Sequence, residues 1–243
     1  MRRLPRYLLV LAGALLIAAL TLYAYRELLA RPFAADDYQW LLNVRGLGQR
    51  ELLRTAFDPR AQTHFYRPLV WLLFWGQLRM FGLDPRGFHI VSLGLHLLNA
   101  GLTGWLAWRL LAARSRIENR GSLAPSREAR DPQSSIFSWR PVVFVLAMAI
   151  VALHPAPFEA VAWVSAQSEL LAAALLLLAL HAWLSGDTRH ELRGMSAKIE
   201  DRGLRVAQPN PRSSIFNLRA CLSPWLLLAT LALALALLAK ESA

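Results

Sequence analysis

The chain has 243 residues, of which 56% are hydrophobic, and its 27 Lys and Arg against 16 Asp and Glu give a net charge of +11. The mean hydropathy is +0.34, and the apolar residues gather in long blocks that need lipid around them, which excludes an ordinary soluble domain. The arginines lie beside these blocks rather than on a helix with base-reading side chains, which excludes nucleic acid as a partner.

The first apolar block, residues 7–25, follows Arg2, Arg3 and Arg6 and is long enough to cross a bilayer as a helix. Its basic flank predicts a cytoplasmic N-terminus. A cleaved signal peptide is the alternative, but the block is longer than a usual signal sequence and bulky residues follow its small ones. We therefore expect a retained anchor.

Two adjacent carboxylates, Asp36 and Asp37, follow this block and precede Tyr38 and Trp40, which are typical of a membrane interface. Two adjacent carboxylates repel each other unless a cation compensates their charge. Such a pair is suited either to bind a metal ion or to abstract a proton. The alternative is structural, because an Asp before a helix accepts hydrogen bonds from free backbone amides. From these residues alone, the structural alternative is the stronger one.

The first outer loop, residues 31–87, contains two segments of helical character. Residues 51–57 carry apolar side chains on one face and charges opposite, so they predict a helix that lies on the membrane surface or, equally, packs against the bundle. Residues 68–83 are short and contain Gln77 and Arg79, and burying a guanidinium in lipid costs roughly 2.5–3.5 kcal/mol. We predict an interfacial or re-entrant helix there.

Arg67 stands directly before this second segment, and Pro68 is favourable in the first turn of a helix. A guanidinium at this place can bind a phosphate through two hydrogen bonds. An Arg that reaches from a helix end to lipid headgroups is the commoner alternative.

Four further blocks are long enough to cross the bilayer, at residues 88–111, 136–153, 160–184 and 222–239. Residues 154–168 contain no Lys or Arg, whereas the loops 112–135 and 185–221 are rich in Arg, so the positive-inside rule places the first outside and the other two inside. The sequence therefore predicts an all-α polytopic membrane bundle of about five spans, with interfacial or re-entrant helices in its first outer loop.

The stretch from residue 154 to 171 combines two prolines with His154, Glu159 and Glu169 in apolar surroundings. Ionisable groups at membrane depth usually face a cavity and act there. Lys240 is a further ionisable residue, at the end of the last apolar block. An ion pair with the following Glu at the membrane interface is the simpler explanation for it. A transporter-like bundle is one functional alternative, with Glu169 and the broken backbone marking a substrate path.

Two cytoplasmic inserts, residues 113–135 and 187–219, share the patterns RIENRG and KIEDRG, each followed by SSIF. The spacing between the patterns differs by three residues, so the inserts are not a rigid repeat. Their Pro, Ser and Arg content cannot bury enough apolar surface to offset ordering entropy, and we expect flexible tethers. Electrostatic attachment to anionic inner-leaflet lipid is the alternative.

Four motifs occur in order: Asp-Asp-Tyr from Asp36, Tyr-Arg-Pro-Leu around Arg67, His-Pro followed by Glu-Ala-Val-Ala-Trp-Val-Ser from His154, and Lys-Glu-Ser from Lys240. Together they resemble the GT-C superfamily of membrane glycosyltransferases, in particular its transmembrane, tetratricopeptide-repeat-containing O-mannosyltransferase-like branch. The resemblance implies transfer of a sugar from a polyprenyl-phosphate donor to an acceptor hydroxyl on a protein or glycan. It places the reaction on the extracytoplasmic face of the membrane, here the bacterial plasma (inner) membrane.

The resemblance also implies roles for individual residues. Asp36 or Asp37 becomes the candidate catalytic base or the ligand of a divalent metal cofactor. Candidate contacts to the donor and its phosphate are Arg67, His154, Glu159, Glu169 and, more weakly, Lys240.

Two features depart from the family pattern. Gln167 stands where the related branch tends to have Arg, which removes one expected contact. The sequence ends at Ala243, directly after a span, whereas family members continue through further helices. We therefore expect residues 1–243 to be the N-terminal part of a GT-C-like transmembrane domain, with a non-catalytic truncated remnant as the alternative.

Overall fold

The computed structural model of the chain describes residues 6–61, 66–121, 132–201 and 224–239. Within these ranges the chain is helical and forms no strand, which confirms the all-α prediction for them. The elements in order are α1 (Arg6–Ala24), η1 (Arg26–Ala30), α2 (Asp36–Val44), α3 (Gln49–Phe57), α4 (Pro68–Phe81), α5 (Pro85–Gly121), α6 (Pro132–Leu153), α7 (Phe158–Ala162), η2 (Val164–Ala166), α8 (Gln167–Asp201) and α10 (Pro224–Ala239).

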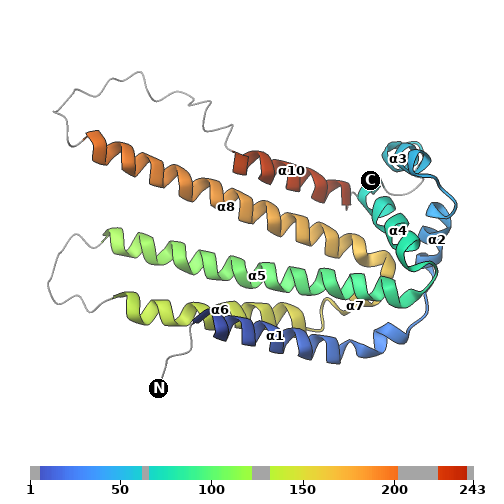
Figure 1. Cartoon of the computed structure of the whole chain (residues 1–243), viewed down its shortest axis with the longest axis horizontal. Helices are drawn as coiled ribbons and strands as arrows, with labels where there is room; N and C mark the ends of the chain where they lie inside the picture. Colours follow the sequence, from blue (N-terminus) through green and yellow to red (C-terminus); the bar gives the residue numbers. More distant parts are fainter. Residues whose placement is uncertain (1–5, 62–65, 122–131, 202–223, 240–243) are drawn as a thin grey trace.

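The long helices α1, α5, α6, α8 and α10 lie side by side, and the short elements gather at one end of this bundle (Figure 1). Helix α5 packs against both α6 and α8, while α1 packs against α6 and α10 against α8. Two helical segments are long and apolar enough to cross a membrane, Pro85–Ala113 and Val164–Ser185. Leu8–Ala24, Trp139–Leu153 and Leu227–Ala239 are apolar but shorter, so length and composition support two of the five predicted spans.

Glycines allow α6 to approach its neighbours closely. A Cβ atom at Gly104 of α5 would lie 2.8 Å from the carbonyl oxygen of Phe144 in α6, and one at Gly13 of α1 would lie 2.6 Å from a methyl group of Val145. Packing of this kind, with a small residue at the contact, is common between membrane helices.

Buried polar side chains of α5 bind the backbones of both neighbouring helices. The His96 Nε2 atom lies 3.1 Å from the Ala152 carbonyl oxygen in α6. The Asn99 side-chain amide donates to the Leu170 carbonyl oxygen in α8 at 2.9 Å. Helix α5 is therefore tied to α6 and α8 within the apolar interior.

A second set of contacts joins α5 to α8 farther from the short elements. The Arg109 guanidinium donates to the His181 carbonyl oxygen at 2.7 Å and lies 3.3 Å from its Nδ1 atom. Because arginine only donates, Nδ1 is an acceptor, and His181 Nε2 carries the proton that it donates to the Leu102 carbonyl oxygen at 3.0 Å. The His181 ring also stacks on Trp105, with 4.3 Å between ring centroids.

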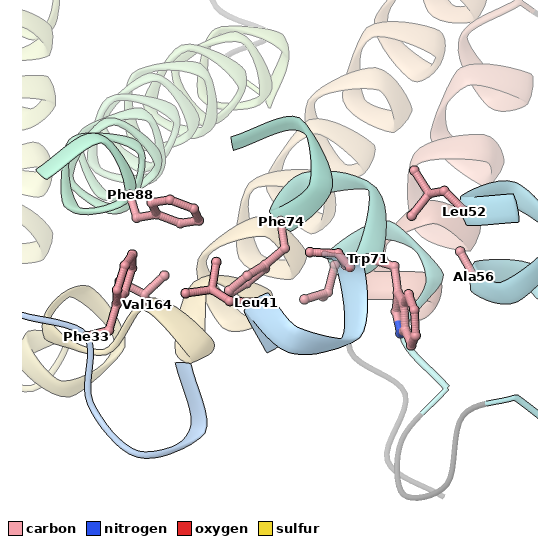
Figure 2. Packing of buried hydrophobic residues seen from close by; sticks show 10 residues of the cluster. Phe33, Leu41, Leu52, Ala56, Trp71, Phe74, Phe88 and Val164 are labelled. Carbon is pink, nitrogen blue, oxygen red and sulfur yellow. The ribbon is translucent and has the colours of Figure 1, made fainter. Parts of the chain in front are cut away.

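An apolar cluster holds the short elements together at their end of the bundle (Figure 2). It joins residues between η1 and α4 to residues of α4, α5 and η2, namely Phe33, Leu41, Val44, Leu52, Ala56, Val70, Trp71, Phe74, Phe88 and Val164. The Phe88 ring lies 5.1 Å from Phe33 and 6.0 Å from Phe74, between centroids. The short elements α2, α3, α4 and η2, which this cluster holds together, form the cap of the bundle. The 14 residues of α4 extend only about 21 Å, short of a hydrocarbon core of about 30 Å.

The long helices continue into both inserts, where we predicted flexible tethers. Helix α5 extends to Gly121 and α8 to Asp201, because Ala, Leu, Arg and Glu favour propagation of a helix that is already formed. Residues 122–131 and 202–223, which contain much of the two inserts, lie outside the described residues.

Candidate functional site

Asp37 is a buried carboxylate that connects the segment before α2 to the segment after α6. Its side chain is only 2% exposed. One oxygen accepts a hydrogen bond from the Ala34 amide at 2.9 Å, and the other accepts from the Ser165 amide in η2 at 2.7 Å. Hydrogen bonds to a charged acceptor are the strong ones, so this carboxylate fixes two segments that are 128 residues apart.

Asp36 has the opposite surroundings, since its side chain is exposed. The residue before it, Ala35, has φ 27° and ψ −96°, a conformation that side-chain-bearing residues rarely adopt. Such a backbone costs about 1–3 kcal/mol and often accompanies a functional constraint. After this turn Asp37 lies in the interior and Asp36 at the surface.

Arg67 lies next to the same segment, at the start of α4. Its guanidinium donates to the Ser168 hydroxyl in a long contact of 3.4 Å. Burial lowers the pKa of the half-buried Arg67, and the Glu169 carboxylate acts in the opposite direction. An arginine keeps its proton in proteins, so Arg67 supplies a fixed positive charge at this end of the bundle.

His154, Glu159 and Glu169 also lie at this end, but all three side chains are exposed. Their predicted place in a cavity that binds the donor therefore stays a prediction. Helix α6 ends at Leu153 and the following prolines turn the chain at the bundle surface, where the His154 Nδ1 atom accepts from the Ala156 amide at 3.1 Å. The predicted phosphate contact Lys240 lies outside the described residues.

Gln167 forms a buried polar network that the sequence analysis did not predict. Its side-chain carbonyl accepts from the Gln77 amide at 2.7 Å, and its own amide donates to the Phe88 carbonyl oxygen at 2.9 Å and the Ser92 hydroxyl at 3.0 Å. Gln167 therefore joins α4, α5 and α8 and has a structural role. The signal was Gln77, a polar residue in the middle of an apolar segment.

His89 is another buried polar residue near the site, with a side chain 1% exposed. Neither ring nitrogen has a hydrogen-bond partner of good geometry within the described ranges. The Arg31 backbone and the Asp37 carboxylate are polar groups close to the ring. The sequence signal was the row His89, Ser92, His96 and Asn99, which recurs every three or four residues and so shares one face of an apolar helix.

The described part of the chain contains no group of three or more His, Cys, Asp or Glu side chains that could hold a metal ion. Both Asp37 oxygens already accept backbone amides, which leaves Asp36 as the freer carboxylate. A divalent metal at these aspartates therefore stays a prediction, without a ligand set among these residues.

Comparison with protein-family models, with curated proteins and with solved structures finds no match for this chain. The resemblance to membrane glycosyltransferases therefore stays a prediction. At one end of the bundle, the buried carboxylate of Asp37 accepts a hydrogen bond from the Ser165 amide, and the Arg67 guanidinium donates to the nearby Ser168 hydroxyl. Asp36, next to Asp37 in α2, adds an exposed carboxylate.

Proposed function

We propose that this chain is a polytopic membrane protein whose extracytoplasmic end transfers a sugar from a polyprenyl-phosphate donor to an acceptor hydroxyl. The observation that carries the proposal is the 2.7 Å hydrogen bond from the Ser165 amide to Asp37. It brings the aspartate pair to the proline-containing segment, as a shared reaction centre at the bilayer surface requires.

A bundle of about five spans is supported by the outward side chains of the shorter helices. Leu15 in α1, Ile150 in α6 and Leu237 in α10 are 61%, 66% and 62% exposed. Lipid solvates such side chains at no cost, whereas water does not. The short elements lie at one end of these helices, and the end of α5, the start of α6 and the end of α8 lie at the other (Figure 1).

In the proposed reaction Asp36 is the general base, because it is the exposed carboxylate of the pair. It takes the proton of the acceptor hydroxyl while the acceptor oxygen forms a bond to the sugar C1 atom. The bond from C1 to the donor phosphate oxygen breaks at the same time, and Arg67 stabilises the charge left on the phosphate. Asp37 is a positioning residue that holds the loop carrying Asp36.

The test is transfer of mannose from polyprenyl-phosphate mannose by the purified chain in lipid nanodiscs. We expect Asp36→Asn to lower the rate at least about 10²-fold, because a positioned general base contributes roughly that much. Asp58→Asn is the matched control, since Asp58 is an exposed carboxylate of the same outer loop. Equal rates for both variants and the unaltered chain would remove Asp36 from the mechanism.

Transport is a second candidate, favoured by the row of buried polar residues on α5. His89, Ser92, His96 and Asn99 lie within a helix that is long and apolar enough to span a membrane. Polar groups at such depth often mark a substrate path. Solute uptake into proteoliposomes that lack any lipid-linked sugar would favour this candidate over the transferase.

A further inference from the structure

Helix α3 lies across the direction of the long helices at the end of the bundle that carries the site. In Figure 1 it is viewed nearly along its own axis, whereas α5 and α8 extend across the picture. A helix that runs across spanning helices at their end lies parallel to the membrane plane. This is the orientation of helices that bind a membrane surface.

One face of α3 packs on the protein and the adjacent face does not. Leu52 and Ala56 are fully buried against the cap, in which α3 contacts α4. Leu53 and Phe57, each one position further along, are both 45% exposed. The helix therefore buries two of its apolar side chains in the fold and leaves two others partly exposed.

The side chains follow a fixed order around the helix, at about 100° per residue. The exposed apolar pair Leu53 and Phe57 comes next to the buried pair, and the exposed arginines Arg50 and Arg54 come next to it. Glu51 lies beyond the arginines, on the side away from the apolar residues. Basic residues that border an apolar stripe can extend their charged ends to headgroups while their stems cover apolar surface.

We propose that this outward face of α3, formed by Arg50, Leu53, Arg54 and Phe57, binds the surface of a membrane that contains anionic phospholipid. The apolar pair enters the boundary between headgroups and acyl chains, and the two guanidinium groups bind headgroup phosphates. Charge complementarity selects anionic lipid, since two arginines and no acidic residue border the apolar stripe. The proposal concerns a lipid-binding surface and does not depend on the transferase activity.

The test uses a polarity-sensitive fluorophore on single cysteines in the full chain, with the native Cys221 replaced by Ser. The label is placed at Phe57→Cys, within the proposed surface, and at Glu51→Cys, on the opposite side of the same helix. Each variant is reconstituted as one copy per nanodisc, in pure phosphatidylcholine or with phosphatidylglycerol added. We expect blue-shifted emission at position 57 and not at position 51, with a larger shift when phosphatidylglycerol is present.

The two arginines separate the electrostatic part of this binding from the apolar part. A basic residue near an anionic surface contributes about fivefold to partitioning into it. Arg50→Gln and Arg54→Gln together are therefore expected to reduce the gain in membrane partitioning of α3 that phosphatidylglycerol causes, read from the emission at position 57, roughly 25-fold. Arg79→Gln, on the exposed side of α4, is the matched control. Equal emission at positions 51 and 57 in both lipids, or a shift at 57 that appears only with two copies per disc, would overturn the proposal.

Discussion

Asp36 and Asp37 are neighbours in the chain with opposite surroundings, and substitution should affect the stability of the protein differently at each. Asp37→Asn places an amide group against one of two backbone donors, Ala34 or Ser165, and leaves that donor without an acceptor. The cost of an unsatisfied buried donor is about 1–3 kcal/mol of unfolding free energy.

Asp36→Asn is the matched substitution, and it should change the unfolding free energy by less than about 0.5 kcal/mol because Asp36 is exposed. Equilibrium unfolding in detergent micelles compares the two variants directly. If both variants unfold like the unaltered chain, Asp37 does not anchor the loop. The same pair of variants also separates loss of transfer from loss of structure in the proposed mechanism.

At the scale of elements, the hydrogen bonds between Gln77 and Gln167 hold α4 against the long helices. We expect Gln77→Leu and Gln167→Leu to cost about 1–3 kcal/mol each, because each leaves the remaining buried amide incompletely bonded. The double variant should cost less than the sum, since both polar groups are removed together. A double-mutant cycle of unfolding free energies measures this difference, and simple additivity would show that the two side chains act independently.

The sequence predicted elements with a strong local pattern and missed those that depend on distant contacts. The apolar blocks located the long helices, and Gln77 with Arg79 correctly set α4 apart from them. The fourth block was expected to be one helix over residues 160–184, but α7 and η2 come first and α8 begins only at Gln167. The chain is extended at Trp163, and two residues later the Ser165 amide binds Asp37, a contact that no local pattern reports.

The candidate site was predictable in its residues and not in their surroundings. The aspartate pair and Arg67 are conspicuous in an apolar sequence, and the structure places them at the same end of the bundle. Which aspartate is buried depends on the unusual turn at Ala35, a residue type that gives no sign of such a backbone. The role of Gln167 likewise depends on three partners from two other helices.

At the scale of the whole molecule, the arrangement predicts which positions share one side of the membrane. Cysteines at Asp36 and Glu159 should react with a membrane-impermeant maleimide added from the same side. A cysteine at Asn119, near the far end of α5, should react only from the other side (Figure 1). Labelling of right-side-out and inverted vesicles, in a Cys221→Ser background, checks this. Reaction of positions 36 and 159 from opposite sides would contradict the transferase proposal and the placement of the cap.

The hydrogen bond between Asp37 and the Ser165 amide has a consequence for how the protein is made. Asp37 leaves the ribosome 128 residues before its partner. At 5–20 residues per second this interval is on the order of ten seconds. Throughout that time the loop after α1 lacks the backbone amide that Asp37 binds in the folded protein. Closure of this loop is therefore a late event of biogenesis, because it requires synthesis of the chain as far as Ser165.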